Sequence, residues 1–185
     1  MQEIFDVLNK DGTFTGIKKT RDEIHKSGDW HRVACVWVIN SKKEVLIQLR
    51  SSLKSNSPNM WNVSCAGHIS AGEDGKTGAI REVKEELGLD IGPDELIYLG
   101  ESIEKDDADE NATYKDNEIH ACFLVIKDIN TNDFSLQKEE VAEVKWVNYL
   151  DLKKDLVENQ TKYVGHRDLY NALFSYIENT TFPKS

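Results

Sequence analysis

Three closely spaced glutamates in a strongly patterned segment constrain the fold of this chain more than any other feature. Apolar side chains recur at helical spacing at Ala79, Ile80, Val83 and Leu87. Glu82, Glu85 and Glu86 stand at positions i, i+3 and i+4 of the same segment, so on a helix they share one face. We therefore expect a helix over residues 74–87 that buries one stripe and presents carboxylates to a cleft. Gly88 is the expected stop at its C-terminal end.

The three carboxylates indicate a metal site. At about 5–6 Å apart on one helix face, they repel one another unless a cation offsets their charge. Oxygen ligands of this kind suit Mg²⁺ or Mn²⁺ rather than Zn²⁺, and such ions neutralise charge as a phosphoanhydride bond is cleaved. Taken alone, the segment EVKEEL is more typical of a solvated helix face, so the assignment depends on the residues around it.

The wider segment Gly67–Leu89 resembles the signature of the Nudix (MutT-like) hydrolase family at every fixed position. That signature has a Gly, five residues, a Glu, seven residues, Arg-Glu, an apolar residue, any residue, Glu-Glu, any residue, Gly and an apolar residue. From average residue usage, a chance match is on the order of 10⁻⁹ per start position. The resemblance implies a hydrolase that cleaves the phosphoanhydride bond of a nucleoside diphosphate derivative or a related diphosphate, with Mg²⁺ or Mn²⁺ as cofactor.

The same resemblance implies a role for each matched residue. The implied metal ligands are Glu82, Glu85, Glu86 and the backbone at Gly67. The implied catalytic residues include Glu82, Glu85 and Arg81, which would orient a helix carboxylate. One of the three glutamates could also be the general base. Glu73 would tie the loop to the helix, and Gly88 belongs to the structural frame of the segment.

A wider similarity over residues 3–150 points to the branch that includes isopentenyl diphosphate isomerase. It is carried by EIFDVLNKDG, by SCAGHISAGE and by DNEIHACFLV. In the isomerase, a catalytic Cys directly precedes the Gly-His of this loop, where this chain has Ala66. Cys65 lies one place earlier and would point the opposite way on an extended segment. Hydrolysis is therefore the expected activity, and isomerase-like activity or a non-catalytic diphosphate-binding module are the alternatives.

The isomerase resemblance also implies a second metal site. The matching positions are His25, His31, His68, Asp116 and Glu118. Whether they converge stays open, because the histidines could equally be loop and turn residues. Glu118 begins a predicted strand and is a further candidate catalytic residue, as a ligand or base. Arg50 and His68 are the candidate substrate-binding residues, Arg50 because it ends a core strand near the expected cleft.

Three other groups of residues are weaker candidates. The aromatic residues that could stack on a base, but are more often core, are Trp30, Trp37, Trp61, Tyr114 and Phe123. The acidic stretch Glu104–Glu110 is expected to be a mobile loop that could supply a base. Tyr163 and His166 precede the last helix, and we expect them only to cap it.

The order of predicted elements indicates an α+β fold. Strands are expected at 3–8, 33–40, 44–50, 61–64, 96–103, 118–126 and 143–147, and helices at 74–87, 151–157 and 168–177. The turn at 41–43 makes a hairpin of the first two core strands. We expect a Nudix-type α/β/α sandwich with a mixed sheet between helices. Residues 1–185 would form one domain, with an N-terminal extension (1–29), a core (30–150) and C-terminal helices (151–185).

Charge and composition narrow the partners. The net charge of −10 disfavours binding to nucleic acid. No apolar run approaches the roughly 18 residues of a membrane span, and no secretion signal is indicated. Three cysteines without a CxxC pair indicate buried thiols in a reducing cytoplasm. We expect a cytoplasmic enzyme with a small-molecule diphosphate substrate, no nucleic acid or membrane partner, and either a monomer or a homodimer paired through the N-terminal strand.

Overall fold

A seven-stranded mixed sheet forms the centre of the molecule. The computed structural model describes residues 3–105 and 114–182. The strands are β3 (His31–Ile39), β4 (Glu44–Arg50), β5 (Trp61–Asn62), β6 (Cys65–His68), β7 (Ile97–Lys105), β8 (Asn117–Ile126) and β9 (Val141–Asn148). Their order is β5-β4-β3-β8-β7, with β6 paired to β3 and β9 paired to β4. β3 and β8 run parallel, whereas the other pairs are antiparallel.

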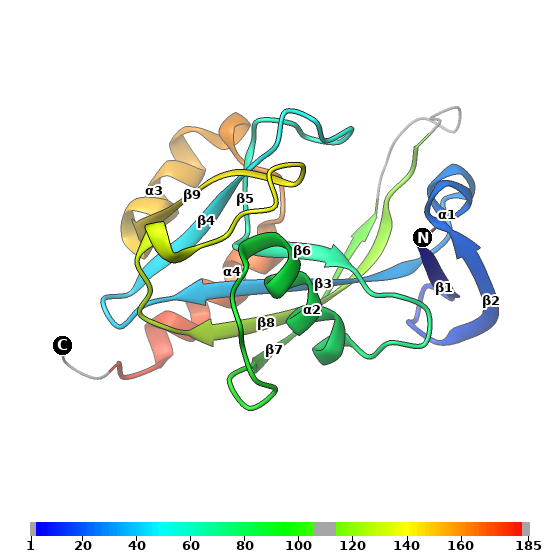
Figure 1. Cartoon of the computed structure of the whole chain (residues 1–185), viewed down its shortest axis with the longest axis horizontal. Helices are drawn as coiled ribbons and strands as arrows, with labels where there is room; N and C mark the ends of the chain where they lie inside the picture. Colours follow the sequence, from blue (N-terminus) through cyan, green and yellow to red (C-terminus); the bar gives the residue numbers. More distant parts are fainter. Residues whose placement is uncertain (1–2, 106–113, 183–185) are drawn as a thin grey trace.

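Helices cover both faces of this sheet (Figure 1). They are α2 (Gly75–Leu87), α3 (Tyr149–Glu158) and α4 (Arg167–Asn179), with 3-10 turns η1 (Thr131–Asp133) and η2 (Gln160–Lys162). Successive strand residues point to opposite faces, so Val36 and Val38 of β3 pack in the α2 core while Cys35 and Trp37 pack in the α3–α4 core. The expected α/β/α sandwich is therefore confirmed.

A separate unit precedes the main sheet. β1 (Ile4–Leu8) and β2 (Phe14–Thr20) form a two-stranded sheet, and α1 (Arg21–Ser27) follows (Figure 1). The sequence predicts no helix or strand between residues 9 and 32, so both β2 and α1 correct the expectation. α1 forms there because Thr20 and Glu23 make a reciprocal capping box and Gly28 ends the helix at φ 70°.

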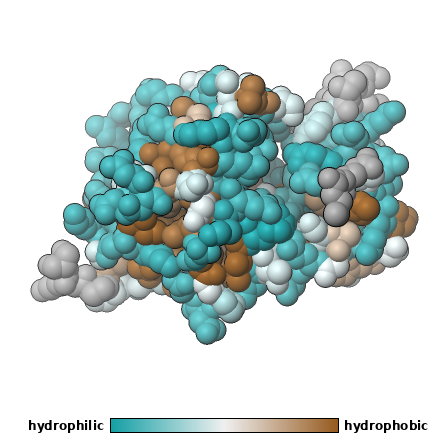
Figure 2. Space-filling model, viewed as in Figure 1, coloured by the Kyte–Doolittle hydropathy of each residue, from teal (hydrophilic) through white to brown (hydrophobic). Residues whose placement is uncertain are grey.

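Most other predicted elements are present. The hairpin is confirmed by the pairs Val38–Leu46 and Ile39–Val45. β7 runs to Lys105, so Glu104 belongs to a strand, while the rest of the predicted acidic loop, 106–110, lies outside the described residues. Hydrophilic residues cover most of the face shown in Figure 2. Within the described ranges, no helix has both the length and the apolar character needed to cross a membrane.

Candidate active site

Helix α2 carries the three glutamates and has a defined start and end. The Asp74 carboxylate accepts a hydrogen bond from the Thr77 amide at 2.8 Å and caps the helix. Gly88 ends it with a φ of 69°, which few residues other than glycine adopt. A Cβ at position 88 would also lie 2.6 Å from the Cβ of Ser135. These contacts fix which way the helix presents its acidic face.

Arg81 connects the helix to the preceding loop. Its Nε and Nη2 donate to the two carboxylate oxygens of Glu73 at 3.1 and 2.8 Å, which is a bidentate pair. Nη2 also donates to the His68 carbonyl at 2.9 Å, and Nη1 donates to Glu82 at 2.6 Å and Glu85 at 3.1 Å. The hydrogen bonding of the Arg81 guanidinium to the Glu73 carboxylate is the main cause of the raised pKa of Arg81. Arg81 therefore holds two of the glutamates in place.

Glu86 is buried, and the Glu82 side chain is 13% exposed. Glu86 is 5% exposed, and burial raises its pKa to about 8. Gln48 donates to it at 3.2 Å. Burial also raises the pKa of Glu82, although Arg81 opposes this shift. Glu85 is about half exposed at its side chain. A buried carboxylate with a raised pKa favours either a proton or a cation, so these residues fit a divalent metal.

A second group of ligand side chains lies nearby, and it contains the histidines of the isomerase resemblance. The ligand atoms of His25, His31, His68 and Glu118 lie within 4.8 Å of one another. Nε2 of His31 and Nε2 of His68 are each 3.6 Å from Glu118 Oε1, and His25 Nε2 is 3.1 Å from Asp116 Oδ1. The register of β3 and β8 places His31 directly opposite Glu118. The five residues therefore converge.

The tautomers of two histidines suit a metal. His25 Nδ1 is 2.7 Å from the Arg21 carbonyl, and His31 Nδ1 is 3.0 Å from the Asp29 carbonyl. A carbonyl only accepts, so in the neutral ring the lone pair lies on Nε2. The Nε2 atoms of His25, His31 and His68 are buried and make no hydrogen bond within residues 3–105 and 114–182. This donor set suits a transition metal.

His68 fits a metal under one further condition. Arg21 Nη1 lies 3.1 Å from His68 Nδ1. A guanidinium only donates, so this contact places the proton of a neutral His68 on Nε2, the atom that faces Glu118. Burial is the main cause of the lowered pKa of His68. Metal binding through Nε2 therefore requires Arg21 to release Nδ1.

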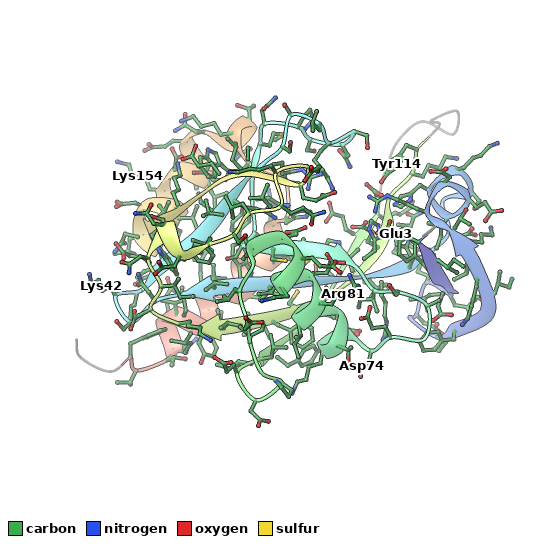
Figure 3. The ribbon with its side chains drawn as sticks, in the orientation of Figure 1. Glu3, Lys42, Asp74, Arg81, Tyr114 and Lys154 are labelled. Carbon is green, nitrogen blue, oxygen red and sulfur yellow. The ribbon has the colours of Figure 1, made fainter. Side chains whose placement is uncertain are left out.

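One cavity of about 470 Å³ joins the two groups. The carboxylates among its described lining residues are Glu3, Glu82, Glu85, Glu86, Glu104, Asp116, Glu118 and Glu140, and the basic residues are Arg21, Arg50, Lys54 and Lys105. Figure 3 shows Arg81 on α2, with Glu3 and Tyr114 toward the N-terminal unit. The acidic excess would repel a diphosphate unless cations bind first.

The candidate substrate-binding residues and the candidate stacking aromatics differ in whether they line this cavity. Arg50 lines it, but its Nη2 donates to the Asn56 carbonyl at 2.8 Å and its Nε to the Ser57 carbonyl at 3.1 Å. Among the five aromatic candidates, Tyr114 lines the cavity. The others lie elsewhere: Trp37 and Phe123 are in the core, Trp61 packs against it, and Trp30 bridges to Leu8.

Strand β6 points the side chains of Cys65 and Ala66 to opposite sides. Ala66 lines the cavity, whereas Cys65 is fully buried in the α2 core, as the alternation of an extended segment requires. Cys35 of β3 is the register partner of Ala66 and also lines the cavity. A thiol therefore lies beside Ala66, although no sequence spacing relates the two positions.

Two site residues were missed or misread from the sequence. His120 Nε2 lies 2.7 Å from Glu118 Oε2; strand alternation from Glu118 could have found it, because i and i+2 share a face. His166 was expected only to cap α4. It occupies the cap position, but its side chain makes no capping bond, and Nδ1 lies 2.6 Å from Glu104 Oε2 instead.

Comparisons with known proteins give a consistent result. The NUDIX domain family model matches residues 29–168. The chain is 37% identical to Nudix hydrolase 3 of Arabidopsis thaliana over 95% of its own length, but it spans only 23% of that protein. It is 34% identical to an uncharacterized Nudix hydrolase of Listeria monocytogenes, covering 97% of this chain and 98% of the relative.

More distant similarities support the same branch and fold. An isopentenyl-diphosphate Delta-isomerase of Aliivibrio fischeri is 25% identical over 96% of this chain and 98% of its own length. A crystal structure of a Deinococcus radiodurans protein superposes with a TM-score of 0.69 at 20% identity, covering 94% and 98% of the two chains. The expected relation to the isomerase-like branch is thus confirmed.

Proposed function

Because this chain belongs to the Nudix hydrolase family, whose members act on phosphoanhydride bonds, we propose that it is a Mg²⁺- or Mn²⁺-dependent pyrophosphohydrolase. Its substrate would be a nucleoside diphosphate derivative or a related diphosphate. The observation that carries this proposal is a pair of carboxylates beside a cavity of about 470 Å³: Glu86, which is buried, and Glu82, whose side chain is 13% exposed. Among the ion pairs of the described residues, Glu82 is paired with Arg81 at 2.6 Å and Glu86 with no cation.

The protein residues would divide the chemistry between them. Bound divalent ions would neutralise phosphate charge and lower the pKa of a bound water. Glu82, Glu85 and Glu86 would hold the ions, and Arg81 would keep Glu82 and Glu85 oriented. A carboxylate, either Glu85 or Glu118, would accept the proton of the attacking water. The water oxygen bonds to phosphorus, the bridging P–O bond breaks, and the leaving phosphate takes that bond's electron pair.

The identity of the group attached to the diphosphate depends on the cavity wall. Tyr114 is the aromatic residue, other than histidines, among the described lining residues. One face of its ring already stacks on His25, with centroids 4.4 Å apart. A nucleobase would therefore have to stack on the other face. If it does, Tyr114→Ala should raise the KM of nucleotide substrates about 5- to 100-fold and leave the KM of prenyl diphosphates nearly unchanged.

A substrate screen tests the proposal. Nucleoside di- and triphosphates, dinucleotides, nucleotide sugars and prenyl diphosphates would be assayed for phosphate release with Mg²⁺ and with Mn²⁺. We expect release from at least one class, and a drop of about 100-fold or more in Glu86→Gln and Glu85→Gln. Glu95→Gln is the control, because Glu95 lies outside the cavity and pairs with Lys127. Full turnover in both Glu86→Gln and Glu85→Gln would refute the metal-site assignment.

The convergence of His25, His31, His68 and Glu118 favours a second candidate function, isopentenyl diphosphate isomerisation. Ala66 argues against it, since the isomerase has a Cys there. Incubation with isopentenyl diphosphate, followed by NMR, separates the two activities. We expect no allylic isomer. Its formation without phosphate release would replace the hydrolase proposal.

A further inference from the structure

A third cluster of ligand side chains lies on the other side of Glu118, and we propose that it binds a divalent cation of the Zn²⁺ type. Its members are Glu104 of β7, His120 of β8 and His166 at the start of α4. One ligand atom from each lies within 4.8 Å of the others, and all three residues line the cavity. This inference concerns metal binding and does not depend on which diphosphate is cleaved.

The sheet and α4 bring these residues together. In the antiparallel β7–β8 pair, Glu104 is opposite Glu118 and Ser102 is opposite His120, so Glu104 and His120 point to the same face. α4 packs against β7, and the Nδ1 of its cap residue His166 lies 2.6 Å from Glu104 Oε2. The His120 and His166 rings lie edge to face, with centroids 5.5 Å apart. The cluster thus rests on three elements of regular structure.

His120 supplies the observation that points to a cation. Its side chain is 1% exposed, and its Nε2 lies 2.7 Å from Glu118 Oε2. A neutral ring that donates from Nε2 has its lone pair on Nδ1. This Nδ1 is buried, makes no hydrogen bond within the described parts of the chain, and lies 3.7 Å from Glu104 Oε2. In the neutral form of the ring, this lone pair and the Glu104 carboxylate face each other, and a cation between them would satisfy both.

The spacing suits a metal after a small movement. Ligands at about 2.0–2.1 Å from a tetrahedral metal are separated by about 3.3 Å. The distance from Glu104 Oε2 is 3.7 Å to His120 Nδ1 and 2.6 Å to His166 Nδ1, so the His166 ring has to shift by less than about 1 Å. Two imidazoles and one carboxylate are ligands of zinc and similar borderline ions.

Three protein ligands leave the metal an open position toward the cavity. A water or a phosphate oxygen could occupy it, as in other three-ligand zinc sites. The Glu118–His120 hydrogen bond would then link this ion to the His25–His31–His68 group. A carboxylate that orients a ligating histidine in this way strengthens metal binding.

Zinc binding tests the proposal without any assay of turnover. The full chain would be made metal-free and dialysed against Zn²⁺, and the bound metal would be counted by elemental analysis. The wild-type protein should bind one more equivalent of Zn²⁺ than the Glu104→Gln and His166→Asn variants do, or it should bind that equivalent at least tenfold more tightly. Glu101→Gln is the control, because Glu101 lies on the same strand and pairs with Arg32 outside the cluster. Asn is a favourable residue at the N-cap position of a helix, so His166→Asn should not weaken the start of α4.

Diffraction at the zinc absorption edge locates the ion directly. Crystals of the zinc-loaded protein should give an anomalous peak between Glu104, His120 and His166. The peak should persist in the His31→Ala variant, which lacks one ligand of the neighbouring group of His25, His31 and His68. Equal zinc content in all variants, or a peak only beside His31, would overturn the proposal. The cluster would then be an ion pair with a protonated His120 that holds α4 against β7.

Discussion

A side chain at Gly67 would collide with the Glu82 carboxylate. A Cβ at that position would lie 2.0 Å from Glu82 Cδ and 2.2 Å from Oε2. Real Cβ atoms do not approach other heavy atoms so closely, so either the carboxylate or the β6 backbone would have to move. The close approach of strand β6 and helix α2 therefore sets the position of Glu82, a proposed metal ligand. This steric limit requires glycine at position 67 whether or not the backbone there approaches an ion.

Gly67→Ala should therefore weaken metal binding as well as the fold. We expect Mn²⁺ affinity, measured by electron paramagnetic resonance, to fall at least about tenfold, in the range seen when the support of a ligand is lost. The free energy of unfolding should fall by about 1–3 kcal/mol. Gly92→Ala is the matched control, because its nearest neighbour would be Glu95 Oε2 at 3.7 Å. Unchanged Mn²⁺ affinity in Gly67→Ala would contradict this view of the site.

The buried Glu86 carboxyl should make the stability of the metal-free protein depend on pH. Burial raises its folded-state pKa from 4.5 to about 8. Between these values the folded state keeps a proton that the unfolded state has lost, so the stabilisation is full below about pH 4.5 and is lost as the pH rises through about 8. Urea unfolding in a chelator should therefore show a lower free energy of unfolding at about pH 8.5 than at about pH 5.5.

Glu86→Gln isolates this contribution, because glutamine cannot bind the proton but can still accept from Gln48. The variant should show a much smaller fall in stability across the same pH range, and above about pH 8 it should be more stable than the metal-free wild type. Glu85→Gln is the control, since the Glu85 side chain is 53% exposed. If both variants kept the full pH dependence, another group would have to be responsible.

The sequence predicts the helix that carries Glu82, Glu85 and Glu86 and most strands of the sandwich well, because the apolar periodicity of each element is local. The stripe through Val83 and Leu87 and the stop at Gly88 are properties of consecutive residues. The group of His25, His31, His68 and Glu118 is different: His25 lies on a helix that the polar composition of residues 18–29 does not reveal, and Glu118 is distant in the chain. Resemblance to the isomerase named those residues, but their convergence needed the parallel register of β3 and β8.

His120 and His166 differ in whether the sequence alone could predict their place in the site. His120 stands two places after Glu118, so alternation could have placed it on the same face. His166 carries no such signal. Its contact with Glu104 arises because α4 packs back on β7 after a long excursion, and no local pattern encodes that return.

The Glu73–Arg81 pair should matter for stability more than an ordinary surface pair. Glu73 accepts two hydrogen bonds from Arg81 and one from the Ser70 amide at 3.0 Å. We expect Glu73→Gln to lower the free energy of unfolding by about 1–3 kcal/mol. Glu95→Gln removes a charge that also accepts from a cation and an amide, but at an exposed site. The free energy of unfolding should fall by less than about 1 kcal/mol in Glu95→Gln, measured in the same denaturation assay. An equal fall in the two variants would contradict the prediction.

The cap of α1 should influence metal binding, since that helix carries His25. Thr20 accepts from the Glu23 amide, and the Glu23 carboxylate accepts from the Thr20 amide at 2.9 Å. Thr20→Ala should lower the free energy of unfolding by about 0.5–2 kcal/mol. It should also weaken Zn²⁺ binding to the His25 group, measured by calorimetry, because the ring is held through the Arg21 carbonyl in the first turn.

Asn148 provides the matched control for that prediction. It caps α3 by accepting from the Leu150 amide at 3.0 Å, and α3 contributes no residue to the described cavity wall. Asn148→Ala should cost a similar free energy of unfolding, about 0.5–2 kcal/mol, yet leave Zn²⁺ affinity unchanged. If both variants weakened Zn²⁺ binding equally, the effect would reflect general loss of stability. If neither did, His25 would not depend on α1 for its position in the metal group.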